Sequence, residues 1–185
     1  MPEIRLPIAT PSLRLRHFVL EDAPRAMALN GEPSTRLWLP SHVYANLEDA
    51  VSRLGVLISA YASPGHPARG PYVLAVDHGR TGELLGHVGF SPLDTEVEVS
   101  FAIAESARGH GYGVEALLHA CDWAASTFGL RRIVAVTAAG NAASRRTLER
   151  ARFAHERDEV MRFQGNTEPV SRYGWRSGPD PDATA

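Results

Sequence analysis

The sequence has very little cysteine, since Cys121 is the only one among 185 residues. A single cysteine cannot form a disulfide within the chain, which is typical of proteins from a reducing compartment. No apolar run approaches the roughly 18 residues that a membrane-spanning helix needs. The first residues also lack the apolar core of a signal peptide. These absences predict a cytoplasmic protein that does not enter a membrane.

The chain also lacks an excess of charge of either sign, with 19 basic residues, 21 acidic residues and a formal net charge of -2. This balance argues against nucleic acid as a partner. The eight histidines show no metal-ligand spacing, which predicts that no metal is bound. The length and the ordinary globular composition fit one domain, expected over residues 1–176, with a disordered tail at 177–185.

Hydrophobic periodicity predicts a mixed α/β fold in the order β-α-α-β-β-β-α-β-α-β-β. Asp22 and Asn46 are expected to cap the first two helices, and an aromatic-rich loop is expected between these helices. Short turns favour an antiparallel meander in the middle of the chain, and one strand-helix-strand unit at 102–137 allows one parallel pair. The expected strands cover residues 12–18, 72–76, 83–91, 96–104, 133–136, 154–163 and 170–175, and the two later helices cover 114–128 and 142–150.

The segment that points most directly to chemistry is the turn between the fourth strand and the third helix. Three alternate positions lack a Cβ, and the first turn of a helix carries unpaired N–H groups that attract an anion. A pyrophosphate group is the anion that would fit such a turn. From the glycine pattern alone, a tight turn without a ligand explains these residues equally well. The residues of the turn are Arg108, Gly109, His110, Gly111, Tyr112 and Gly113.

Two other phosphate-binding schemes fit these glycines poorly. A P-loop ends in Gly-Lys-Ser or Gly-Lys-Thr, whereas Gly113 is followed by Val114 and Glu115. A dinucleotide-binding turn needs a third glycine at position 114, and it follows a parallel βαβ unit where this chain has antiparallel-type strands. A nucleotide-binding module nevertheless stays open as an alternative function.

Taken with the order of elements, this turn resembles the cofactor signature of the GNAT acetyltransferases, Arg/Gln-x-x-Gly-x-Gly/Ala, which Arg108-x-x-Gly111-x-Gly113 matches. Leu13-Arg14-Leu15-Arg16, the helix entry at 111–117 and Asn141-x-x-Ser144 resemble the RimJ/RimL-like branch, so the resemblance covers about residues 10–176. It implies a mostly antiparallel sheet with one parallel strand pair splayed around acyl-CoA and flanked by helices. It also implies that an acetyl group moves directly from acetyl-CoA to a primary amine, on a protein amino terminus or a small molecule.

The resemblance carries residue roles for the donor. Residues 108–113 would bind the pyrophosphate, the backbone of Ile103 would pair with pantetheine, and Asn141 would contact the cofactor. Asn141 also stands where a helix N-cap is expected, and both roles can hold at once. Ile103 is equally expected to be a buried strand residue. Arg152 departs from the family, which usually has a glycine there because the helix ends in the left-handed conformation.

For the chemical step, the resemblance makes Glu98 the base, because it aligns with the glutamate of the family pattern Glu-Ile-Gly-Tyr. Direct transfer needs an uncharged amine and a proton donor for the departing thiolate. The helix after the fifth strand lacks the tyrosine that many members use as the acid, which leaves Ser144. In an alternating strand Glu96 and Glu98 point to one face, and a solvated charged face is the alternative.

The acceptor is expected opposite the cofactor, near Trp38, His42 and Tyr44, with Glu96 and Glu98 attracting a cationic amine. Packing is the alternative role of Trp38 and Tyr44. A catalytically inactive acyl-CoA-binding or regulatory domain is the rival function, because the tyrosine is missing. The sequence leaves the identity of the amine open, and it leaves a homodimer open.

Overall fold

The structure is a computed structural model that describes residues 4–62 and 65–178. Its strands are β1 (Ile8–Ala9), β2 (Leu13–Arg16), β3 (Tyr72–His78), β4 (Leu84–Leu93), β5 (Glu96–Ile103), β6 (Arg132–Ala138), β7 (Ala154–Phe163) and β8 (Asn166–Arg176). Its α-helices are α1 (Ala23–Asn30), α2 (Pro33–Trp38), α3 (Leu47–Ala62), α4 (Tyr112–Phe128) and α5 (Ala142–Arg150).

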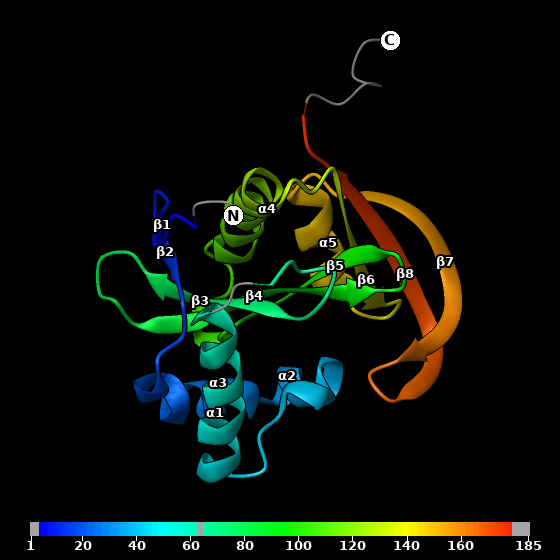
Figure 1. The fold of residues 1–185 in the computed structure, drawn as a ribbon. Coiled ribbons are helices and arrows are strands. Elements are labelled where there is room, and N and C mark those ends of the chain that lie inside the picture. Colours follow the sequence, from blue (N-terminus) through cyan, green and yellow to red (C-terminus); the bar gives the residue numbers. More distant parts are fainter. Residues whose placement is uncertain (1–3, 63–64, 179–185) are drawn as a thin grey trace.

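Within the described residues, one sheet runs in the order β1-β2-β3-β4-β5-β6-β8-β7. Helices α1, α2 and α3 lie on one side of it, and α4 and α5 lie on the other (Figure 1). Neighbouring strands are antiparallel except for β5 and β6, which are parallel. The predicted mixed α/β architecture with one parallel pair is therefore confirmed.

Two short elements differ from the prediction. Helix α2 lies in the segment expected to be an aromatic-rich loop, and its proline occupies the first turn, where a missing N–H costs nothing. Strand β1 extends the sheet by a two-residue pairing with β2. Residues 179–185 of the expected tail lie outside the described residues.

The two predicted caps have different outcomes. Asn46 caps α3 as expected, because its Oδ1 accepts a hydrogen bond from the backbone N–H of Asp49 at 2.9 Å. Asp22 does stand at the N-cap of α1, but its side chain makes no capping bond there. The expected contact to the first turn of α1 is therefore wrong, because this carboxylate accepts instead from the Val19 N–H and from Arg16.

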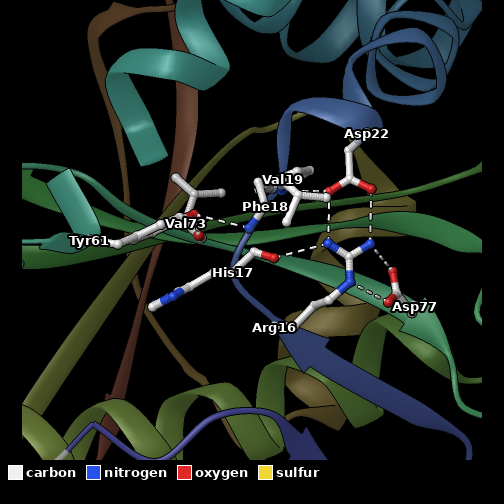
Figure 2. Close-up of polar contacts among 8 residues, drawn as sticks. All are labelled: Arg16, His17, Phe18, Val19, Asp22, Tyr61, Val73 and Asp77. Atoms are coloured by element: carbon white, nitrogen blue, oxygen red, sulfur yellow. Dashed lines mark hydrogen bonds and ion pairs between the residues drawn. The ribbon is translucent and has the colours of Figure 1, made fainter. Parts of the chain in front are cut away.

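Arg16 joins two nearly buried carboxylates where β2 ends (Figure 2). Its guanidinium donates to both oxygens of Asp77 on β3, at 2.6 and 3.0 Å, and to both oxygens of Asp22, at 2.7 and 2.9 Å. The hydrogen bonds that Arg16 donates to Asp22, and then those to Asp77, raise the pKa of Arg16 against the lowering effect of burial. Two fork-shaped pairs of this kind fix the entry to α1 against the sheet.

The helix α5 ends in a left-handed residue, as the family pattern implied, although that residue is an arginine. Arg152 has φ +66°. The N–H of Phe153 reaches the carbonyl of Leu148, and the N–H of Arg152 reaches that of Glu149, which is the Schellman arrangement. Leu148 and Phe153 are both buried, so their contact offsets the strain of a side chain in this conformation.

We expect the Arg16→Met variant to lose about 3 kcal/mol or more of unfolding free energy, because Asp77 would be left buried without its charged partner. Arg14→Met is the matched control, since Arg14 lies on the exposed face of the same strand and should change stability by only about 0.5 kcal/mol. Urea unfolding followed by circular dichroism measures both. Equal losses in the two variants would contradict the structural role of Arg16.

Candidate active site

A cleft opens where the parallel strands β5 and β6 part. The two strands pair at Glu98 and Val134, and in the described residues no further pair follows toward Ile103 and Ala138. A cavity of about 680 Å³ fills the gap. Its walls include Ser34 and other residues of α2 on one side of the sheet, and residues at the starts of α4 and α5 on the other. The cleft therefore crosses the sheet.

Ion pairs hold the other end of this strand pair closed. Glu96 on β5 accepts a hydrogen bond from Arg132 Nε on β6 at 2.6 Å, and it also pairs with Arg172 on β8. Arg132 reaches Glu156 on β7 at 2.7 Å. A Cβ at Gly174 would lie only 2.1 Å from the Glu156 carboxylate, so this network needs a glycine there.

The side chains of β5 alternate between the two faces of the sheet. Phe101 and Ile103 lie on the α4 side, because both approach the position that a Cβ on Gly113 would take, at 3.8 Å. Glu98 and Ser100 must then point to the α1–α3 side, since successive residues of a strand face opposite ways. The turn that precedes α4 and the carboxylate of Glu98 thus lie on opposite sides of one gap.

The three positions of the 108–113 turn that hold glycine require it for different physical reasons. Gly109 and Gly111 have φ +83° and +82°, in the left-handed region that side chains disfavour. Gly113 is helical, and a Cβ there would approach Thr147 of α5 to 3.2 Å. Two glycines therefore shape the turn, and the third allows the start of α4 to pack closely against α5.

This turn leaves backbone N–H groups without helical acceptors at the start of α4. The N–H of Glu115 bonds to the Gly111 carbonyl, so the N–H groups of residues 112–114 precede the first helical hydrogen bond and have no helical acceptor. The Glu115 carboxylate is engaged by Thr10 Oγ1 and by the Ser12 N–H at 2.7 Å. Its negative charge is thus held by the β1–β2 turn, away from the open donors.

The cleft is strongly positive. Arg108 donates to the Ile103 carbonyl at 3.0 Å and to Ser34 Oγ at 2.6 Å, which ties the turn to α2. Three further arginines line the cleft, and Glu98 is its only carboxylate among the described residues. Sequence reasoning missed these three, although the spacing of two of them on one helix is a signal for a shared face. They are Arg146 and Arg150 on α5 and Arg162 on β7.

Of the other residues predicted to bind the acyl-CoA donor, some line the cleft and one does not. Tyr112, Ile103 and Asn141 line the cleft, whereas His110 does not. The His110 ring stacks on Tyr112, and its Nδ1 lies 3.0 Å from the Arg108 carbonyl oxygen. Asn141 caps α5, because its Oδ1 accepts from the Ser144 N–H at 3.1 Å. Their roles toward a cofactor remain predictions.

Glu98 lies at the point where the two strands separate. Burial raises the pKa of its carboxyl to about 7, against the lowering effects of a backbone hydrogen bond from Val136 and of the charge of Arg172. Ser144, in the first turn of α5, lines the same cleft. Its hydroxyl makes no hydrogen bond to any described residue. The cleft therefore contains a carboxyl that titrates near neutrality and a free hydroxyl.

The four predicted acceptor residues do not gather at one place. Trp38 and His42 line the cleft, and a Cβ on Gly140 would lie 3.7 Å from the Trp38 ring. The guanidinium carbon of Arg53 lies over the Tyr44 ring, 4.7 Å from the ring centre. Tyr44 lines a different cavity, which His42 also lines. Glu96 lines neither cavity, and its hydrogen bond from Arg132 lowers its pKa, so attraction of an amine by Glu96 stays a prediction that this geometry does not favour.

Residues 12–154 match the family model of the acetyltransferase (GNAT) domain. The chain belongs to the GNAT acetyltransferase family. Membership makes the protein an acyl-CoA N-acyltransferase, and the resemblance read from the turn at 108–113 is confirmed. Among curated protein sequences, none matches this chain.

RimJ and RimL proteins are among the solved structures that share this GNAT fold. RimL, a ribosomal L7/L12 alpha-N-protein acetyltransferase in complex with coenzyme A, is 18% identical, with TM-score 0.75 over 90% of this chain and 95% of that one. A ribosomal-protein-S5-alanine acetyltransferase from Vibrio fischeri is 18% identical, with TM-score 0.77 over 93% and 97%. Mycobacterium smegmatis RimJ, in complex with CoA-disulfide, is 16% identical, with TM-score 0.73 over 89% and 82%.

The described residues of this GNAT domain contain neither a metal-binding cluster nor a membrane-spanning helix. In residues 4–62 and 65–178, no three histidine, cysteine, aspartate or glutamate side chains gather where they could hold a metal ion. No helix in the described part of the chain is long and apolar enough to cross a membrane.

We expect Gly111→Ala to raise the Kd of coenzyme A about tenfold, since alanine at φ +82° costs about 1–2 kcal/mol and the turn would relax away from its donor geometry. Gly82→Ala is the matched control, because Gly82 has φ +70° in the β3–β4 turn, away from the GNAT cleft. Isothermal titration calorimetry measures both. An unchanged Kd in Gly111→Ala, or an equal loss in Gly82→Ala, would count against the anion site.

Proposed function

We propose that this protein transfers the acetyl group of acetyl-CoA directly to a primary amine, with both substrates bound in one ternary complex. The observation that carries the proposal is the cleft between β5 and β6, which has open helix N–H groups on one side and a buried carboxyl with a pKa near neutrality on the other. We further propose that residues 1–176 act as one domain, in keeping with a sheet that continues from β1 to β8.

The donor side fits the phosphates of coenzyme A. The unpaired N–H groups of residues 112–114 and the helix dipole favour an anion at the start of α4. Arg146 and Arg150 also line the cleft and have no ion pair with a described residue, so their charges are available to phosphate oxygens. Acetyl-CoA would supply an activated thioester, and the gap would align it along the edge of β5 near Ile103.

Glu98 is suited to removing the proton of the amine. With a pKa of about 7, its carboxyl is ionised in a large fraction of molecules at neutral pH and still holds appreciable affinity for a proton. It faces the α1–α3 side, opposite the donor turn, which is the side from which an amine would approach. The proton would pass to Glu98 directly or through one water as the new C–N bond forms.

Ser144 is suited to returning a proton to the departing thiolate. Ser144 stands in the first turn of α5, on the donor side of the cleft, and its hydroxyl makes no hydrogen bond to a described residue. The hydroxyl is therefore free to donate as the C–S bond breaks, with water restoring its proton.

An inactive acyl-CoA-binding domain is the rival function, and it predicts no transfer of the acetyl group. Release of free thiol from acetyl-CoA with a panel of amines therefore separates the two functions.

Glu98→Gln should remove the rise of kcat with pH that we expect around pH 7, because glutamine cannot accept the proton. Below the pKa of about 7 the wild-type carboxyl is protonated and inactive as a base, and above it the carboxylate is active. We expect kcat of the variant to be at least about 100-fold lower at pH 8. An unchanged profile on a genuine acceptor would exclude Glu98 as the base.

A stability measurement on the same variant gives an independent readout. The folded-state pKa of Glu98 is raised above its ordinary value of 4.5, so this group favours the folded state below pH 4.5 and loses that contribution as pH rises through about 7. Glutamine does not ionise. The melting temperature of Glu98→Gln relative to that of the wild type should therefore be higher at pH 8 than at pH 5.

A further inference from the structure

A second cavity adjoins the cleft on the α1–α3 side of the sheet. It has a volume of about 480 Å³, within the range of small-molecule pockets. It lies under α3, and its walls include Phe18, Leu29, Leu54, Leu57, Tyr72 and Val73. It shares two lining residues with the cleft, His42 and Ser100. The two spaces therefore meet where an amine would approach Glu98.

The sheet provides a continuous floor from this cavity to the cleft. Val73, Gly89 and Ser100 are paired in one row across β3, β4 and β5. A Cβ on Gly89 would lie 3.1 Å from Val73 and 3.4 Å from the Ser100 hydroxyl. Because Gly89 has no side chain, nothing projects from the sheet between these two residues. A group resting on Val73 can thus extend past Ser100 into the cleft without a barrier at Gly89.

Most of the wall residues are apolar, and no carboxylate is among the described residues that line the cavity. Arg53 lines it too, but its guanidinium donates to the carbonyls of Val43 and Ser41 and lies over the Tyr44 ring. Arg69 is the other charged group. A second ammonium group on a substrate would find no partner here and would be repelled by these arginines, at a cost in desolvation.

The junction between the two spaces is uncharged at neutral pH. His42 Nδ1 lies 3.2 Å from Nε2 of His87, which is buried on β4. Burial lowers the pKa of both rings, assisted at His42 by the charge of Arg53, and the pKa of His87 falls to about 3. One ring donates to the other while both are neutral, so an apolar group can pass beside them.

We propose that the second cavity holds the apolar side chain of the acceptor, so that the substrate is a primary amine carrying one bulky apolar group and no second cation. This inference rests on the proposed acetyl transfer and names the class of its acceptor. The donor enters from the α4 side, and a long acyl chain would have to occupy the junction that the amine needs. The acceptor is therefore the occupant that leaves room for both substrates.

The test compares acceptors that differ only in their apolar group, alaninamide, leucinamide and phenylalaninamide, with spermidine as a polycation. With acetyl-CoA as donor, kcat/KM should be at least tenfold higher for phenylalaninamide than for alaninamide, and lowest for spermidine. Equal or reversed preference among these amines would overturn the proposal. Failure of every amine to release thiol would instead contradict the proposed acetyl transfer.

A filling variant localises the effect. Leu57→Trp should lower the ratio of kcat/KM for phenylalaninamide to kcat/KM for alaninamide at least tenfold. Val51→Trp on the same helix, which lines neither cavity, should leave that ratio unchanged. Ala60→Trp gives a second filling variant at an exposed lining position, where the fold tolerates a large side chain. A change confined to the preference between acetyl-CoA and hexanoyl-CoA would assign the cavity to the donor and overturn the proposal.

Equilibrium binding separates this inference from catalysis. Calorimetry of phenylalaninamide against the protein saturated with coenzyme A should show binding that Leu57→Trp weakens at least tenfold and Val51→Trp does not. The proposal is overturned if phenylalaninamide binds both variants equally, whatever the rate of acetyl transfer.

Discussion

The ion pairs among Glu96, Arg132, Arg172 and Glu156 hold the closed end of the gap between β5 and β6. These side chains come from four strands, and they join the two halves of the sheet just beside the Glu98–Val134 pair. Hydrogen-bonded clusters of this kind are costly to break, because each charge loses its partner in a partly buried place. With that end closed, the strands can part toward Ile103 without splitting the sheet.

The parting of the strands explains how one cleft would serve both substrates of the proposed transfer. On the α4 side, two left-handed glycines and the open N–H groups of α4 would hold the phosphates of the donor in the proposed function. On the opposite side, Glu98 is buried deeply enough for its pKa to reach about 7. In the proposed function, the gap that would receive the donor thus borders a base whose pKa is raised by burial. Four arginines line the cleft, whereas most of the residues that line the proposed acceptor cavity are apolar.

Local sequence patterns predict the elements that form the donor side but few of the contacts between them. The turn at 108–113, the helix that follows it and the N-cap at Asn141 depend on residues adjacent in the chain, and the structure has them where the pattern indicates. Helix α2 was not predicted, because six residues beginning with Pro33 carry too little periodicity. Arg16, which takes Asp22 away from a capping role, also pairs with Asp77, and no local pattern relates Arg16 to a residue 61 positions further along the chain.

The acceptor side was predicted least well for the same physical reason. Glu96 and Glu98 look equivalent in an alternating strand, yet one meets Arg132 and Arg172 while the other lies at the opening of the gap. Only the order of strands in the sheet distinguishes them. Likewise His42 meets His87 across 45 residues of sequence, and no local pattern relates the two.

Calorimetric titration of the protein with acetyl-CoA, NAD and ATP tests the central claim most directly, since that claim is that the gap and its turn form an acyl-CoA site. We predict saturable binding of acetyl-CoA to one site and no measurable binding of NAD or ATP at the same concentrations. Binding of NAD or ATP without binding of acetyl-CoA would contradict the account and identify the turn as part of a nucleotide site.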